Sequence, residues 1–322
     1  MIDYRAFRNG DPPALWRLWQ GHPPRGVYRP VITPFLFDHC VLSKSYFDRA
    51  GLIVAIDGNT PIGFAHAGFG PNADGSALDT QVGTTSCVCL EPHAERTEIA
   101  RQLLARTEAY LHGRGARQLH FGPLHPVDPF YVGLMDVSGS PGVLASDGDT
   151  LALLAEQGYR ELDRHLILRR TLNDFRAPMD RQQAQLKRNF TVEFIQDPPA
   201  KTWWEAATLG QLERTLFTVQ KRGGVATIAS ASFWDAPHFG PPTLQATGLL
   251  SLNIPADAAR DGLGVMLLGE ALKTLQTQGS TVVETQIRRE DSRSAELLFR
   301  LGFQEIDQAI VLAKELSAAD VV

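Results

Sequence analysis

A unit of sequence that occurs twice limits the fold of this chain more than any other feature. The segment LLARTEAYLHGRGARQL begins at Leu103, and LLGEALKTLQTQGSTVV matches it 164 residues later, from Leu267. A second pair, GYRELDRHLILRRTL from Gly158 and GFQEIDQAIVLAKEL from Gly302, matches at an offset of 144 residues. The matches come in the same order, and their spacing is far longer than that of a solenoid repeat. We therefore predict two tandem domains built on one pattern.

The repeat sets the predicted domain boundaries at 1–172 and 173–322. The shorter second offset means that copy one carries about 20 additional residues, which we assign to an insertion near 123–147. This stretch is rich in proline, glycine and aromatic residues, and long loops of this kind often bind ligands or cover a site. The alternative is a plain surface insertion. The insertion residues predicted to contact a substrate are His125, Phe130 and Tyr131.

Both copies predict the same order of elements. In copy one the apolar runs at 51–58 and 60–70 meet at Asp57-Gly58, a dipeptide typical of a hairpin turn. Hairpin strands are followed by strand, helix, strand, helix and strand, and copy two repeats this order. The predicted fold class is α/β (α+β). Each domain is expected to hold a mixed, mostly antiparallel sheet with helices on both faces.

Copy two contains a glycine turn of the kind that binds anions. The turn RDGLG at 260–264 follows an apolar strand ending at Ile254 and precedes a helix predicted over 262–278. The first N–H groups of a helix lack internal partners, and the helix dipole adds partial positive charge there. Glycine lets the backbone approach a phosphate with no Cβ in the way. The turn therefore predicts a phosphate site.

Three segments of copy two, LNIP at 252–255, RDGLG at 260–264 and SRSAELLFRLGF at 292–303, carry a family resemblance. They are similar to the cofactor strand, the pyrophosphate loop and the final helix of the GNAT superfamily of N-acetyltransferases. The resemblance covers nearly the whole chain, twice over. The two-domain arrangement resembles that of mycothiol synthase.

The resemblance implies acetyl-CoA as the cofactor. In this family the cofactor strand splays from its neighbour, and its free backbone groups pair with the pantetheine arm of coenzyme A. The loop amides cradle the pyrophosphate, with the helix dipole behind them. The residues that the resemblance assigns to coenzyme A are Leu252, Asn253, Ile254, Arg260, Asp261, Gly262, Leu263, Gly264, Val265 and Ser292.

The sequence departs from the family pattern at several positions. Arg260 stands one place beyond the usual Gln/Arg position, and Ser292 replaces the common asparagine. Phe299 replaces a tyrosine that often protonates the leaving thiolate in the family, and phenylalanine has no proton to give. In copy one, Glu98 and Ala100 stand where the loop glycines belong. A carboxylate and a Cβ both oppose a diphosphate, so copy one is predicted not to bind coenzyme A.

Acetyl transfer to an amine needs a base that removes a proton from the ammonium. Glu284, in STVVETQI, lies on the strand beside the predicted cofactor strand and is the predicted catalytic base. The alternative for Glu284 is an exposed strand carboxylate without a catalytic role. His120 and His125 flank the insertion and are the other candidates, because histidine titrates near neutrality.

Two functions follow from these observations. The first is an acetyl-CoA-dependent N-acetyltransferase, a transferase that acts from copy two on the amine of a small molecule. The second is a non-catalytic acyl-CoA-binding or regulatory protein that keeps the fold, which the phenylalanine at position 299 favours.

Composition bounds the partners. The net charge is −5 and there is no long basic run, so no nucleic-acid partner is expected. No apolar stretch reaches the length of a membrane helix, so no membrane association is expected. Three cysteines predict a reducing, cytoplasmic location. Cys87 and Cys89 lack a second Cys/His pair, so no metal site is predicted. A monomer or a homodimer fits equally well.

Overall fold

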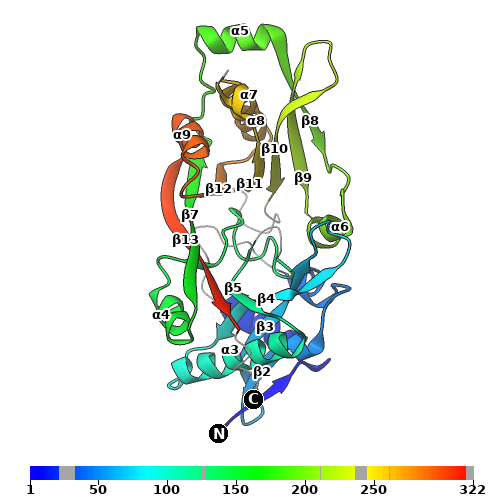
Figure 1. The fold of residues 1–322 in the computed structure, drawn as a ribbon, viewed down its shortest axis with the longest axis vertical. Coiled ribbons are helices and arrows are strands. Elements are labelled where there is room, and N and C mark those ends of the chain that lie inside the picture. Colours follow the sequence, from blue (N-terminus) through cyan, green and yellow to red (C-terminus); the bar gives the residue numbers. More distant parts are fainter. Residues whose placement is uncertain (22–32, 125–127, 211, 236–244, 261, 317–322) are drawn as a thin grey trace.

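The computed structural model describes residues 1–21, 33–124, 128–210, 212–235, 245–260 and 262–316. In these ranges 13 strands form one continuous sheet. The two copies lie end to end along the long axis of the molecule, copy one below and copy two above in Figure 1. None of the helices in the described ranges is long and apolar enough to cross a membrane.

Copy one contains short turns of helix at Asp38–Leu42 and Arg49–Gly51 besides its regular elements. These elements are β1 (Ile2–Ala6), α1 (Pro12–Gly21), α2 (Pro34–Phe37), β2 (Leu52–Asp57), β3 (Thr60–Pro71), β4 (Leu78–Leu90), α3 (Arg96–Gly113), β5 (Gln118–Phe121), β6 (Val143–Leu144), α4 (Gly148–Glu156) and β7 (Arg160–Thr171).

Copy two repeats the main order, with α5 and α7 as additional helices. Its elements are α5 (Arg181–Asn189), β8 (Phe190–Gln196), α6 (Trp203–Leu209), β9 (Arg214–Lys221), β10 (Thr227–Asp235), β11 (Ala246–Asn253), α7 (Ala256–Arg260), α8 (Leu263–Thr277), β12 (Val282–Arg288), α9 (Ser292–Arg300) and β13 (Gln304–Glu315). The pairs α4/α9 and β7/β13 keep the offset of 144 residues at both ends.

The two copies exchange their last strands. The sheet order is β1-β2-β3-β4-β5-β13-β7-β12-β11-β10-β9-β8. The strand that ends copy one, β7, therefore pairs with β12 of copy two, and the strand that ends copy two, β13, pairs with β5 of copy one. β7 and β13 pair antiparallel with each other at the centre of the molecule (Figure 1). Each half of the sheet is thus completed by the other copy.

Helices cover both faces of the sheet, as the sequence predicted. α3 packs on β2, β3 and β4, and α8 packs on β8, β9 and β10. On the opposite face of copy one, α1 buries Leu15, Leu18 and Trp19 in a cluster with side chains of β2, β3 and β4. The predicted fold class is confirmed: a mixed, mostly antiparallel sheet with helices on both faces.

A β-bulge at the same place in each copy supports the repeat independently. In β4 the pairing with β3 passes from Thr85 to Cys87 and leaves Ser86 as the extra residue. In β11 the pairing with β10 passes from Leu249 to Ser251 and leaves Leu250 as the extra residue. The two bulges lie 164 residues apart, which is the offset of the first sequence match. A bulge bends its strand and re-aims the groups beside it.

Candidate functional site

β11 and β12 separate part of the way along their length. They pair in parallel from Ala246 with Val282 to Leu249 with Thr285, and the pairing ends there. At this last pair the Thr285 hydroxyl donates a hydrogen bond to the Leu249 carbonyl over 3.0 Å. Beyond this point β11 continues to Asn253 beside β10 only, and β12 continues to Arg288 beside β7. The splay that the family resemblance implied for this strand is therefore present in copy two.

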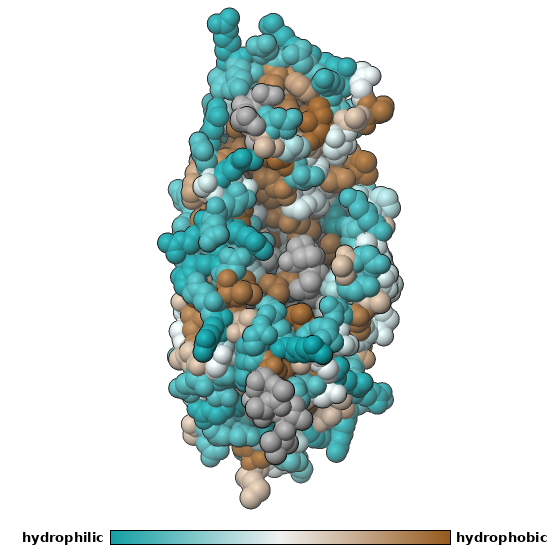
Figure 2. Space-filling view, viewed as in Figure 1, coloured by the Kyte–Doolittle hydropathy of each residue, from teal (hydrophilic) through white to brown (hydrophobic). Residues whose placement is uncertain are grey.

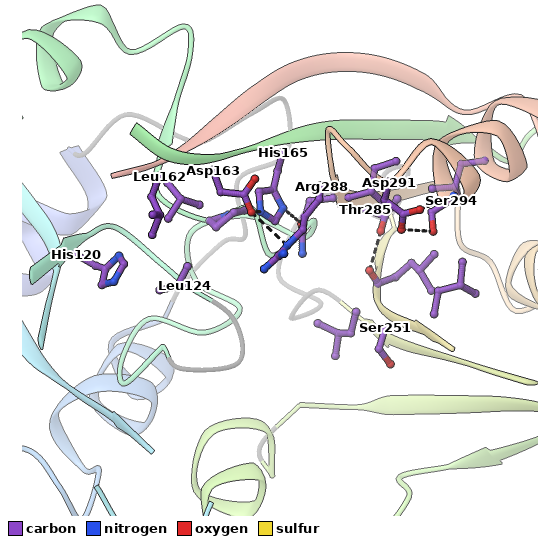
Figure 3. A pocket seen from close by; sticks show the side chains of 18 residues that line it. His120, Leu124, Leu162, Asp163, His165, Ser251, Thr285, Arg288, Asp291 and Ser294 are labelled. Atoms are coloured by element: carbon purple, nitrogen blue, oxygen red, sulfur yellow. Dashed lines mark hydrogen bonds and ion pairs between the residues drawn. The ribbon is translucent and has the colours of Figure 1, made fainter. Parts of the chain in front are cut away.

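A cavity of about 680 Å³ lies at this opening. One end is bounded by Ser251, Thr285 and Ser294, and the other by His120, Leu124 and Leu162 (Figure 3). Figure 2 shows apolar side chains along the middle of this face, over β10, β11 and β12. The full lining is His120, Leu124, Pro141, Leu162, Asp163, His165, Leu249, Leu250, Ser251, Leu252, Thr285, Gln286, Ile287, Arg288, Asp291, Ser294, Leu298 and Val311.

Gly262 begins α8 close to the end of β11. Its φ of 78° lies in the left-handed region, which glycine adopts without strain. A Cβ on Gly264 would lie 2.8 Å from Cδ1 of Ile254 and 2.9 Å from Cδ2 of Leu297, so these two side chains pack directly on the glycine. Helical bonding starts with the Met266 amide donating to the Gly262 carbonyl. The amides of residues 263–265 precede that bond, as in the first turn of any helix.

The other residues assigned to coenzyme A occupy different surroundings. Leu252 lines the cavity, whereas the side chains of Leu263 and Val265 point into the core of copy two. Ser292 is exposed, and Ser294, two residues later, lines the cavity instead. Asn253 is exposed and Ile254 is half-buried. Asp261 and the side chain of Arg260 lie outside the described residues.

Glu284 is buried in an ion pair beside the cavity. Its side chain lies opposite Arg169 of β7, whose Nε donates to Glu284 Oε1 over 2.8 Å and whose Nη2 contacts the same oxygen. Burial raises the pKa of Glu284, Arg169 acts to lower it, and Asp136 acts to raise it. The cavity wall begins one residue later, at Thr285. The predicted role of Glu284 as base stays a prediction.

The insertion divides between the core and the cavity. Tyr131 stacks on Trp19 with ring centroids 4.6 Å apart, and its hydroxyl lies 3.0 Å from Nδ1 of His66. Phe130 stacks on His66 at 4.0 Å. Both aromatic side chains are buried in copy one, while Leu124 and Pro141 of the insertion line the cavity. His125 lies outside the described residues.

Side chains of the insertion pack beside the equivalent opening of copy one. β4 and β5 pair only from Val82 with Gln118 to Thr85 with Phe121, so they also separate. On the α1 face, Cys87 and Cys89 pack with Tyr131 of the insertion in one buried cluster. Cys87 corresponds to Ser251 at the offset of 164, and Ser251 faces the open cavity of copy two.

Two side chains that sequence reasoning missed lie at the centre of the cavity wall. His165 and Asp163 come from β7, the strand exchanged from copy one, and Arg288 faces them from β12 (Figure 3). The repeat carried a signal for the histidine, because the offset of 144 aligns it with Ala309 of copy two. A polar residue that differs between two copies of one strand is a candidate for a function of its own.

Three contacts order this group. His165 Nδ1 lies 2.5 Å from Gln286 Oε1, and His165 Nε2 lies 3.4 Å from Asp163 Oδ2. Arg288 Nε lies 3.2 Å from the same Asp163 oxygen, although its side chain is 73% exposed. At the far end of the cavity, burial lowers the pKa of His120.

Comparison with known proteins agrees with this architecture. No protein-family model and no curated protein matches the chain. A tandem GNAT protein from the clavulanic acid biosynthesis pathway, solved without acetyl-CoA, is 12% identical, with a TM-score of 0.67 over 98% of both chains. A GCN5-related N-acetyltransferase from Sphaerobacter thermophilus is 14% identical, with a TM-score of 0.63 over 98% of this chain and 95% of that one.

A third structure matches over part of its length. It is the GCN5-related glucosamine N-acetyltransferase region of a fungal multi-domain GH3 β-N-acetylglucosaminidase, 14% identical with a TM-score of 0.68. This match covers 98% of our chain and 38% of the other. Likeness at such low identity concerns the fold, so the closer resemblance to mycothiol synthase stays a prediction. The splayed strand, the glycine-started helix and these neighbours together show that the chain has the tandem GNAT fold.

Proposed function

We propose that the chain is an acetyl-CoA-dependent N-acetyltransferase whose active site lies in copy two. The observation that carries this proposal is the separation of β11 from β12 beside the glycine-started helix α8, with a cavity at the opening. The unpaired backbone of β11 would bind the thioester arm there, and the first turn of α8 would bind the diphosphate. In copy one Tyr131 of the insertion packs in one buried cluster with Cys87 and Cys89, beside the equivalent opening.

The residues present fit the chemistry that acetyl-CoA supplies, a thioester with an activated acetyl group. The amides of Gly262 to Val265 would bind the diphosphate, and the outer edge of β11 would pair with the pantetheine arm. The bulge at Leu250 re-aims the backbone beside the cavity. A backbone N–H there is suited to stabilise charge that develops on the thioester oxygen.

The acceptor proposed for this site is a small molecule with an amine. A volume of about 680 Å³ is in the range of small-molecule pockets. Among the described residues, the wall carries the carboxylates of Asp163 and Asp291 and one guanidinium, that of Arg288 beside Asp163, so negative charge exceeds positive charge there and favours a cation. Leu124 lies at the end of the cavity away from the proposed thioester (Figure 3), so this part of the insertion belongs to the acceptor side.

One observation favours the alternative of a non-catalytic acyl-CoA-binding protein. Phe299 stands where the family often has a tyrosine acid, and its side chain is 46% exposed and does not line the cavity. Loss of that acid removes one proton donor for the departing sulfur. Other donors, including the proton that leaves the amine itself, are available to the acetyltransferase.

Calorimetry and a thiol-release assay distinguish the two functions. Titration of the whole chain with coenzyme A is expected to give one site per chain. Free thiol from acetyl-CoA is then measured with a panel of primary amines, and amine-dependent release supports the acetyltransferase. Coenzyme A binding without release for any amine supports the alternative. Two equivalent sites, or none, would contradict the proposal. The cytoplasmic location and the oligomeric state stay predictions.

A further inference from the structure

We propose that His165 is the general base of the acetyl transfer and that Asp163 binds the ammonium group of the acceptor. This inference rests on the proposed function, and it names the residues of copy one that would bind and deprotonate the acceptor. Both residues belong to β7, the strand that copy one gives to the copy-two half of the sheet. The active site of copy two is therefore incomplete without copy one.

The contact with Gln286 determines which imidazole nitrogen carries hydrogen. The carboxamide oxygen Oε1 can only accept, so His165 Nδ1 at 2.5 Å donates to it. In the neutral ring this leaves Nε2 as the acceptor. Gln286 lies on β12, the strand that separates from β11, and it also lines the cavity. The His165 ring is therefore oriented by a side chain of β12. A base needs this acceptor nitrogen turned toward its substrate.

Nε2 of the neutral ring faces a second acceptor. Asp163 Oδ2 lies 3.4 Å away, and two acceptors at that distance do not satisfy each other. A primary ammonium, which has three N–H donors, can donate to both at once. Arg288 contacts the same carboxylate oxygen, but a carboxylate offers about four acceptor positions and can hold both cations. The pair thus has the chemistry of a primary amine site.

We consider the charged groups near His165 on each strand that packs against it. Asp163 lies on its own strand and Arg288 on β12, with Asp291 on the same cavity wall and His120 at the far end. On β13 the residue opposite is Ala309, and the nearby Asp307 accepts a hydrogen bond from Ser146. Asp163 is the carboxylate in contact with the ring, so it compensates the charge that the imidazolium acquires.

The proposed step balances in protons and bonds. The ammonium donates one proton to His165 Nε2 and becomes a neutral amine, whose lone pair is then free. That lone pair forms the C–N bond with the thioester carbonyl carbon, and the C–S bond breaks. The departing sulfur takes the second proton from the nitrogen, which yields an amide and a thiol. His165 returns its proton to solvent.

Glu284 is less well placed for this step. Both contacts of its Oε1 are made by Arg169, and the carboxylate is buried behind the cavity wall. His165 lines the cavity with its side chain 12% exposed. A base must reach its proton directly or through one water, and only His165 of the two meets the cavity.

Nuclear magnetic resonance tests the pair without turnover. The whole chain is labelled with ¹⁵N in the histidine rings, saturated with coenzyme A and titrated with n-butylamine hydrochloride. The His165 signal, assigned from its loss in His165→Gln, is expected to show the Nδ1–H tautomer and to shift on titration. Tetramethylammonium chloride, which has the same charge and no N–H donor, should leave it unchanged. An Nε2–H tautomer, or no shift with n-butylamine, would overturn the proposal.

Kinetics test the catalytic role with an amine that the panel identifies. His165→Gln is expected to lower kcat by about 10²–10⁴-fold and to remove the acidic limb of the pH profile. Asp163→Asn, which keeps the histidine, should raise KM for the amine more than it lowers kcat. Coenzyme A affinity should be unchanged in both. His112→Gln, on α3 and outside the cavity lining, is the matched control and should behave as wild type.

The two proposals fail in different ways. A wild-type chain that neither binds coenzyme A nor releases thiol overturns the acetyltransferase. A wild-type chain that acetylates amines, with a His165→Gln variant of equal kcat and pH profile, overturns only the role of His165.

Discussion

Gly262 combines a left-handed backbone conformation with the first turn of the helix that faces the proposed diphosphate. We predict that Gly262→Glu raises the dissociation constant of coenzyme A about 5- to 150-fold, or by about 1–3 kcal/mol. A carboxylate at this position repels the diphosphate, and a side chain would approach Gln182 and Gln183. Calorimetry with coenzyme A measures the change.

Gly223→Glu is the control for backbone strain. Gly223 has a φ of 75°, close to that of Gly262, and nothing lies within 4 Å of a Cβ built on it. Its coenzyme A affinity should equal that of the wild type. Equal affinity in the Gly262→Glu variant as well would remove the diphosphate from this turn.

Glu284→Gln distinguishes a structural role of this carboxylate from a catalytic one. The substitution leaves Arg169 beside a neutral partner, so we expect the free energy of unfolding to fall by about 1–3 kcal/mol. If Glu284 is the base that the sequence predicts, kcat/KM also falls about 10²–10⁴-fold and the acidic limb disappears. If His165 is the base, both kinetic properties stay near those of the wild type. Urea unfolding and initial rates measure the two effects separately.

The insertion shows, at the scale of elements, how one segment joins both halves. Its Phe130 and Tyr131 fill the aromatic cluster of copy one, and its Val137 carbonyl accepts a hydrogen bond from the Trp234 indole of β10 over 2.8 Å. Val137 also packs with Ala246 and Val282 of copy two. The insertion is therefore part of two cores.

His66, within this cluster, gives the fold a dependence on pH. Burial lowers the pKa of His66 to about 3, and its Nε2 has no hydrogen-bond partner among the described residues. The unfolded chain binds a proton below about pH 6.5 and the folded chain does not, so stability falls as pH decreases from 6.5 towards 3. We predict a loss of about 2 kcal/mol between pH 7 and pH 5 from this residue.

Urea unfolding of two variants at both pH values checks this prediction. His66→Gln removes the titrating group and should lose about 2 kcal/mol of the pH dependence. His112→Gln, on α3, should retain it. A His66→Gln variant with the pH dependence of the wild type would assign the effect to other groups.

At the scale of the whole molecule, the exchange of β7 and β13 joins the two copies in one sheet. Without β13 a fragment of residues 1–172 leaves β5 with an open edge and β7 without its β12 partner. We predict that this fragment alone does not unfold cooperatively and that it associates through exposed strand edges. Mixed with residues 173–322, it should form a one-to-one complex that binds coenzyme A. Circular dichroism and gel filtration test both statements.

A monomeric 1–172 fragment with a cooperative transition would contradict this expectation. It would mean that β7 can turn back onto β5 within copy one, so that each copy closes its own sheet. In that case β7 would stay in copy one, and His165 would not reach copy two in a mixture of the two fragments. The mixture would then lose its acetyl-CoA-dependent acetylation.

The sequence alone determined the repeat, the order of elements and the glycine turn, because each depends on local patterns. The periodicity of apolar residues shows which side chains share a face of a helix or strand. A turn that needs a left-handed backbone is marked by the glycine itself. The tertiary structure decided where the last strands pair. β7 and β13 have the same length and the same alternation of apolar residues at the offset of 144, and backbone hydrogen bonds of a strand do not depend on its side chains. No local pattern distinguishes these partners, so only the assembled sheet could bring His165 of copy one to the cavity of copy two.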